Sequence, residues 1–94
     1  MGTKEEYCFK LYIVDSSPNS VNAVRNLKKL LKKHLQENYS LKVIDVLENP
    51  QVAEDEKILA TPLLVKISPP PVRRIVGDLS DEKRLLPELG ILPQ

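Results

Sequence analysis

Hydrophobic and polar residues recur along the first half of the chain in two different periods. Residues 8–14, CFKLYIV, place apolar side chains on both faces of an extended segment, which is typical of a strand covered on both sides. Over residues 20–37, apolar residues from Val21 to Leu35 recur at three- and four-residue steps, which predicts an amphipathic helix. Residues 41–47, LKVIDVL, predict a second buried strand. Together these segments predict a βαβ unit with parallel strands and a right-handed crossover.

The second half predicts shorter elements separated by prolines. Asn49 followed by Pro50 is typical of a helix start, so we expect a short helix over residues 50–59, although its apolar face is weak. Residues 63–67 and 72–76 predict two strands of a hairpin, joined by a rigid proline-rich turn. Ser80 is the expected N-cap of a last helix that starts over residues 81–86, and Pro87 must end or kink it.

The predicted order, β-α-β-α-β-β-α, is the order of the thioredoxin fold in the α/β class. Thr61-Pro62 immediately before the third strand strengthens this match, because thioredoxin-like proteins place a cis-proline there. A chain of 94 residues is long enough for one compact domain, so we expect residues 1–94 to form a single unit. The fold alone assigns no function.

The residues that thioredoxin-type redox chemistry requires are missing. Such an enzyme needs a cysteine in the loop after the first strand, and residues 15–20 (Asp-Ser-Ser-Pro-Asn-Ser) contain none. Cys8, the single cysteine, lies at the start of that strand, where we expect a buried, inert thiol. His34, the single histidine, lies beside the apolar stripe of the long helix, where we expect a partly exposed residue and not a metal ligand. We therefore expect no catalysis, no metal and no cofactor.

Charge and hydropathy narrow the class of partner. The formal net charge is +1, which creates no strong field toward nucleic acid or an anionic membrane. No apolar run is long enough to cross a bilayer, and the first residues lack the apolar stretch of a secretory signal. We expect a soluble cytoplasmic protein that binds neither nucleic acid nor membrane.

Basic residues gather in the second half of the chain. Arg73 and Arg74 are adjacent on a predicted strand and should point to opposite faces, with Lys66 on the neighbouring strand and Lys57 before the Thr-Pro turn. These residues could form a basic patch that docks on an acidic partner surface. The alternative is solubilising charge on a sheet edge, and charge alone favours this alternative.

Three segments resemble the KaiB family of clock proteins. They are residues 10–21 (KLYIVDSSPNSV), residues 41–62 (LKVIDVLENPQVAEDEKILATP) and residues 69–80 (PPPVRRIVGDLS). They cover roughly residues 10–81. The resemblance implies two folds: a tetrameric ground state with the order β-α-β-β-α-α-β, and a rarer thioredoxin-like monomer that binds the ATPase KaiC. It further implies that bound KaiB captures KaiA and displaces the histidine kinase SasA in a circadian rhythm. A homo-oligomer, dimer or tetramer, is therefore expected.

The resemblance also implies partner-binding residues: Lys57, Lys66, Arg73, Arg74 and Lys42. Some positions depart from the family. Asn22 replaces an arginine associated with KaiA contact, and the end of the chain, LLPELGILPQ, lacks the Gly-Leu-Asp segment that influences fold switching. The departures favour an alternative function, a thioredoxin-like adaptor in stress adaptation or a simple timer in a bacterium without KaiA.

Four prolines, Pro62, Pro69, Pro70 and Pro71, are the candidate hinge of the fold switch. Uncatalysed isomerisation before proline takes roughly tens of seconds or more, which is slow enough to gate a change of fold. We hypothesise that these bonds differ in isomer between the two states. The alternative is that the prolines only stiffen a hairpin turn.

Overall fold

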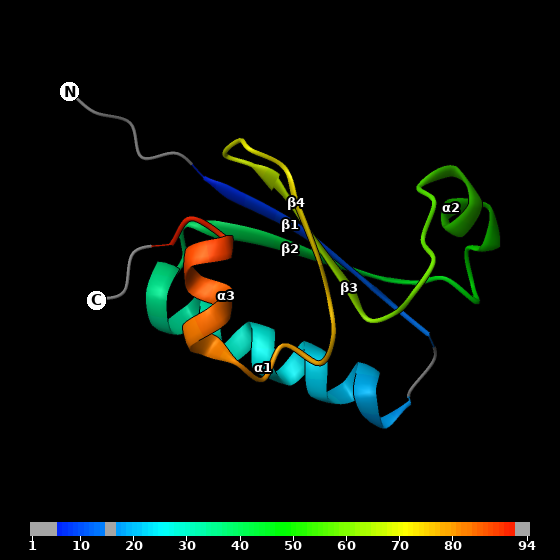
Figure 1. Cartoon of the computed structure of the whole chain (residues 1–94), viewed down its shortest axis with the longest axis horizontal. Coiled ribbons are helices and arrows are strands. Elements are labelled where there is room, and N and C mark those ends of the chain that lie inside the picture. Colours follow the sequence, from blue (N-terminus) through cyan, green and yellow to red (C-terminus); the bar gives the residue numbers. More distant parts are fainter. Residues whose placement is uncertain (1–5, 15–16, 92–94) are drawn as a thin grey trace.

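A four-stranded sheet forms the centre of the molecule, with two helices against one face and a short helix at one end of the other (Figure 1). The computed structural model describes residues 6–14 and 17–91. Its elements are β1 (Tyr7–Ile13), α1 (Pro18–Leu35), β2 (Tyr39–Asp45), α2 (Pro50–Asp55), β3 (Leu63–Ser68), β4 (Arg73–Val76) and α3 (Glu82–Glu88).

The element order confirms the thioredoxin-like prediction, and of the two orders that the resemblance implied this structure has the thioredoxin-like one. The strands are arranged β2-β1-β3-β4. β1 and β2 pair in parallel, as the predicted βαβ unit requires, and β3 pairs antiparallel with both β1 and β4. The predicted hairpin is therefore present, and β2 and β4 are the two edge strands.

A serine network sets the start of α1. The Ser17 side chain caps the helix by accepting from the Ser20 backbone N–H at 3.3 Å, and Pro18 occupies the first turn. The helix thus begins two residues before the predicted start, because a serine cap followed by proline favours this position. The buried Ser20 hydroxyl also bonds the backbone N–H and carbonyl of Val14, so it joins α1 to the end of β1.

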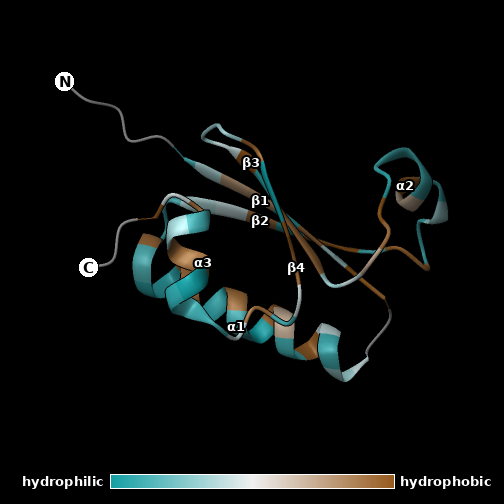
Figure 2. Cartoon of the chain, viewed as in Figure 1, coloured by the Kyte–Doolittle hydropathy of each residue, from teal (hydrophilic) through white to brown (hydrophobic). Residues whose placement is uncertain are grey.

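Two apolar clusters lie on the two faces of the sheet. The larger lies between the sheet and helices α1 and α3, and includes Phe9, Leu11, Leu27, Leu31, Leu64, Ile75, Leu85, Leu86 and Leu89. Alternating hydrophilic and hydrophobic bands along α1 show its apolar stripe (Figure 2). The smaller cluster has Tyr12, Val46, Leu63 and Val65 at its centre, with Val52, Ala53 and Ile58 of the α2 region packed against it. Among the described residues, no helix is long and apolar enough to cross a membrane.

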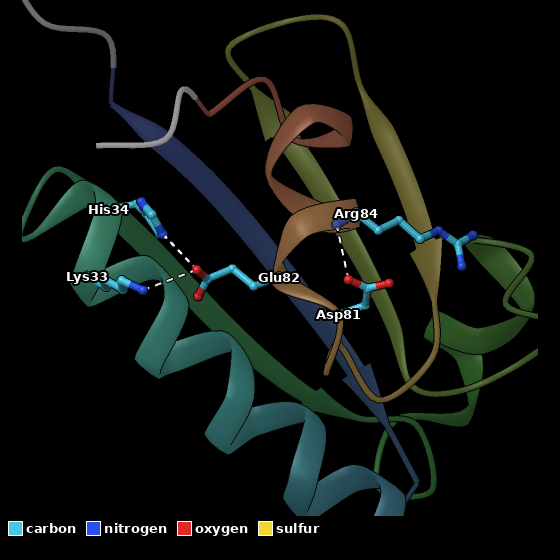
Figure 3. Close-up of polar contacts among 5 residues, drawn as sticks. All are labelled: Lys33, His34, Asp81, Glu82 and Arg84. Carbon is cyan, nitrogen blue, oxygen red and sulfur yellow. Dashed lines mark hydrogen bonds and ion pairs between the residues drawn. The ribbon is translucent and has the colours of Figure 1, made fainter.

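The start of α3 differs from the prediction. Asp81 caps the helix, with its carboxylate accepting from the Arg84 backbone N–H at 3.3 Å, so the expectation that Ser80 caps it is wrong (Figure 3). An aspartate accepts this bond as readily as a serine, and Asp81 lies at the required spacing from Arg84. Pro87 lies inside α3, which ends one residue later at Glu88.

His34 is more enclosed than expected. The residue is half-buried, as expected, but its side chain is only 4% exposed, and its Nε2 lies 3.4 Å from Oε2 of Glu82 on α3. Lys33 reaches the same carboxylate at 3.2 Å (Figure 3). The docking of α3 against α1 covers the imidazole, and this contact between distant segments cannot be inferred from the α1 periodicity.

Candidate partner-binding surface

Arg74 joins the edge strand β4 to the C-terminal end of α2. Its Nη2 donates to the backbone carbonyls of Glu56 and Lys57 at 3.1 and 3.3 Å. Carbonyls at the end of a helix lack partners within the helix and carry partial negative charge, so a guanidinium is favourable there. The side chain therefore fixes α2 against the sheet while it remains exposed.

The loop after α2 presents two side chains to solvent. Between them, Ile58 is anchored: its N–H donates to the carbonyl of Ala53 at 2.9 Å and its side chain packs on the smaller cluster. Lys57 precedes it with φ of +53°, and Leu59 follows it with 97% of its surface exposed. Val76, at the end of β4, is also exposed. Arg74 bonds the Lys57 carbonyl, Leu59 lies two residues after Lys57, and Val76 lies two residues after Arg74 on β4. We name these four exposed residues the α2–β4 corner: Lys57, Leu59, Arg74 and Val76.

Tyr12 lies beneath this corner. Burial raises the pKa of its phenol, the nearby Glu56 carboxylate raises it further, and the charge of Arg74 acts in the opposite direction. The three side chains therefore interact, and they link β1, α2 and β4 through one electrostatic contact.

Arg73 points to the other face of the sheet from Arg74, as predicted. It lines a shallow pocket with Arg74, Ile75, Pro87 and Glu88, and the last two residues place it beside α3. Its register partner on β3 is Lys66.

Lys66 is not part of an exposed patch in this fold. It is 2% exposed, and its Nζ donates to the carbonyl of Leu89 at 3.0 Å, at the C-terminal end of α3. The suggestion that Lys66 joins a basic surface patch does not hold in this fold, because α3 covers this part of β3. Lys66 instead holds the end of α3, where Tyr7 also donates from its hydroxyl to the carbonyl of Gly90 at 3.2 Å.

Lys42 lies apart from the other four predicted partner-binding residues, and its register partner on β1 is Lys10. It is exposed on the edge strand β2 and lines a pocket with Asp45, Glu48 and Asn49. Of the five predicted partner-binding residues, the structure thus brings only Lys57 and Arg74 into one corner. Leu59 could not be singled out from the sequence, because it follows Ile58 in the segment DEKILATP and either residue could have been the exposed one.

The hinge prolines flank β3 on both sides. Pro62 immediately precedes the strand, and Pro69, Pro70 and Pro71 connect it to β4. The Thr61-Pro62 bond is cis, as expected from the thioredoxin-like pattern, and the Ser68-Pro69 and Pro70-Pro71 bonds are also cis.

Cys8 is half-buried, so the expectation of a buried thiol is wrong. Its register neighbours are Ser40 on β2 and Ser68 on β3, and hydrogen bonds from these two side chains lower the pKa of the thiol. Of the loop where a thioredoxin has its active cysteines, Asp15 and Ser16 lie outside the described residues, and Ser17 is the cap of α1.

Comparison with known proteins gives one consistent result. Residues 10–91 match the KaiB domain family. The circadian clock oscillator protein KaiB of Microcystis aeruginosa is 55% identical over 89 residues, covering 95% of this chain and 86% of that protein. KaiB of Nostoc sp. is 56% identical over 89 residues, covering 95% and 82%.

Solved structures agree on the fold. The N-terminal domain of Synechococcus elongatus SasA superposes with a TM-score of 0.74 at 28% identity, covering 95% of this chain and 87% of that one. Chloroplastic thioredoxin z has a TM-score of 0.76 at 18% identity, covering 93% and 78%, which shows a shared fold only. From the family match and the two KaiB relatives, the chain belongs to the KaiB family of circadian clock proteins.

Proposed function

We propose that this chain is a non-enzymatic regulatory module that binds a KaiC-type ATPase in a clock or timer. The α2–β4 corner is the observation that carries the proposal. Leu59 and Val76 are exposed apolar side chains flanked by the cations Lys57 and Arg74, and apolar anchors with a charged rim are the usual composition of a protein-binding surface. Arg74 holds the corner rigid through two backbone bonds, so little order has to be gained on binding.

Arg73 and Lys42 extend the proposed contact beyond this corner. Both are exposed, one beside α3 and one on edge strand β2, so they fit a partner, or several partners, that meets more than one side of the molecule. Lys66 supports such contacts indirectly by holding α3. KaiA and a SasA-like kinase are further candidate partners, and the cytoplasm is the proposed compartment.

We also propose that the chain reaches this fold by switching from a tetrameric ground state. The C-terminal half has features that support a second arrangement: α2 has six residues and none of them is fully buried, and β4 has only four residues. Pro62 and the run from Pro69 to Pro71 bracket β3, so they are suitable boundaries for a segment that changes its pairing. We expect light scattering to find a tetramer at micromolar concentration. We also expect NMR spectra to show a second set of resonances for the C-terminal half.

Co-elution with a cognate KaiC-type ATPase in the presence of nucleotide tests the binding proposal. The unmodified chain should co-elute, and Leu59→Ser should weaken binding by about tenfold or more because it removes the apolar anchor. Lys28→Gln on the exposed side of α1 is the matched surface control and should bind normally. Absence of co-elution in every nucleotide and phosphorylation state of the ATPase would refute the proposal.

The alternative is a stress-adaptation adaptor without a clock partner. The exposed Asn22 on α1, in place of an arginine in the clock family, favours it. This alternative expects a stable thioredoxin-like monomer at every concentration and no ATPase binding, so the same two experiments decide between the functions.

A further inference from the structure

A short link joins the edge strand β4 to α3 and contains an unusual backbone conformation. The link comprises residues 77–81 and runs beside α1 (Figure 1). Leu79, at its centre, has φ of +63°. The other described non-glycine residues with positive φ, Gln36 and Lys57, are polar and exposed, whereas Leu79 is 6% exposed. A bulky apolar residue is an outlier in this region of backbone conformation, so Leu79 is a site of local strain.

Burial of its side chain holds Leu79 in this conformation. The side chain belongs to the larger apolar cluster, whose members include Ile75 of β4 and Leu85 of α3. A glycine at position 79 would adopt this φ without strain, but it would leave a cavity in the cluster. The leucine therefore fills the core while its backbone stays strained.

Hydrogen bonds on both sides of Leu79 also hold the link. Asn26 of α1 donates from Nδ2 to the backbone carbonyl of Asp78 at 2.9 Å, and the Asp78 carboxylate accepts from the backbone N–H of Ser80 at 3.2 Å. A strained residue persists only where its surroundings fix it in this way. Once α3 leaves the sheet, the side chain of Leu79 loses its burial and φ is free to return to negative values.

We propose that the link is a strained hinge that lowers the free energy needed to undock α3 from the sheet. Strain at Leu79 is present while α3 is docked, so undocking releases it and offsets part of the lost apolar contact. The link also lines a pocket of about 170 Å³ with Ile75, Arg84 and Leu85, so packing on this side is incomplete. Such a hinge makes the docking of α3 reversible while β1, α1 and β2 remain folded. The inference goes beyond the proposed function, because it requires neither the ATPase nor a tetramer.

Two substitutions at position 79 separate backbone strain from side-chain burial. Leu79→Ala and Leu79→Gly both remove the packing of the leucine side chain, but only glycine relaxes at positive φ. We expect α3 to open locally about three- to tenfold less often in Leu79→Gly than in Leu79→Ala. Hydrogen exchange at the amides of Leu89 and Ile91, which donate to carbonyls of α3, measures this opening. Amides within α1 are the internal reference and should differ less between the two variants.

Ser80 provides the matched control within the same link. It is exposed and its φ is not positive, so alanine should be the more stable residue there. We expect α3 to open about two- to fivefold more often in Ser80→Gly than in Ser80→Ala, which is the opposite order. Equal opening in the two Leu79 variants, more frequent opening in Leu79→Gly, or a preference for glycine at both positions would each overturn the proposal.

Gly77→Ala tests the hinge without removing a core side chain. Gly77 has φ of +133°, and a Cβ there would meet no atom within 4 Å, so alanine adds backbone strain to the link without a clash. We expect α3 to open at least about fivefold more often in this variant, because the strain is released on undocking. The result decides the proposal even if neither Leu79 variant folds. Unchanged opening of α3, or an equal increase at the amides of α1, would overturn the hinge.

Discussion

Replacing Lys66 with methionine should loosen the attachment of α3. The Nζ of Lys66 donates to the carbonyl of Leu89 at 3.0 Å, and both residues are buried. Methionine keeps most of the apolar stem but removes the donor, so it leaves a helix-end carbonyl unpaired in the interior. A hydrogen bond to a charged group contributes about 1.5–3 kcal/mol, and an unsatisfied buried acceptor costs about 1–3 kcal/mol.

The two free-energy ranges describe the same broken contact, so they are not added together. Removing a buried ammonium also relieves its desolvation cost, which offsets part of the loss. We therefore expect the free energy of unfolding to fall by about 2 kcal/mol. For a domain of this size that corresponds to a decrease of about 8–16 °C in melting temperature.

Urea unfolding followed by circular dichroism, at one fixed protein concentration, measures the global effect, and hydrogen exchange locates it. The amides of Leu89 and Ile91, which follow α3 and donate to the carbonyls of Leu85 and Leu86 in its last turn, should exchange faster. Lys33→Met is the matched control, because Lys33 also contacts α3 but through an exposed ion pair with Glu82, and exposed ion pairs contribute little to stability. Equal effects of the two substitutions, or a loss under about 0.5 kcal/mol for Lys66→Met, would refute the reasoning.

Three further predictions concern titrating groups. Hydrogen bonds from Lys33 and His34 lower the pKa of Glu82 below 4.5 in the folded chain. The ionised Glu82 carboxylate therefore stabilises the fold above pH 4.5, and this stabilisation is lost as the pH falls through the pKa of the folded state. Glu82→Gln should reduce the acid sensitivity of unfolding in urea. The lowered pKa of Cys8 predicts faster alkylation by iodoacetamide than in the unfolded chain, and Ser40→Ala should slow it. The raised pKa of Tyr12 predicts one phenol that ionises above pH 10.0 in ultraviolet titration, and Arg74→Gln should raise it further.

Each of these predictions has an outcome that contradicts it. An unchanged acid limb for Glu82→Gln would mean that the ion pairs with α1 are too weak to matter. Alkylation of Cys8 no faster in the folded chain than in urea would contradict the effect of its serine neighbours. A Tyr12 titration that shifts downward in Arg74→Gln would show that the guanidinium does not stabilise the phenolate.

The order of the elements could be predicted from the sequence because each strand and helix has its own hydrophobic period. Their ends could not, since tertiary contacts set them. β2 begins at Tyr39, two residues before its apolar run, because Tyr39 and Ser40 pair with Tyr7 and Cys8 of β1. α2 ends at Asp55, four residues before the predicted end, because the backbone turns left-handed at Lys57.

The candidate site was predictable only in part. The alternation of a strand correctly separated Arg73 from Arg74, because side-chain direction along one strand is a local property. Burial of Lys66 depends on α3, which follows it by more than ten residues. This burial cannot be inferred from residues near in sequence, so a count of basic residues wrongly includes Lys66 in a surface patch.

The enclosed position of His34 gives this chain a built-in spectroscopic reporter. His34 is the only histidine, so its ring protons give one isolated pair of NMR signals in the unlabelled protein. The ring is 4% exposed and lies 3.4 Å from the Glu82 carboxylate, so undocking of α3 would change both its solvent contact and its electrostatic surroundings. The population of molecules with α3 in place can therefore be followed in real time, without a probe attached to the surfaces that partners use.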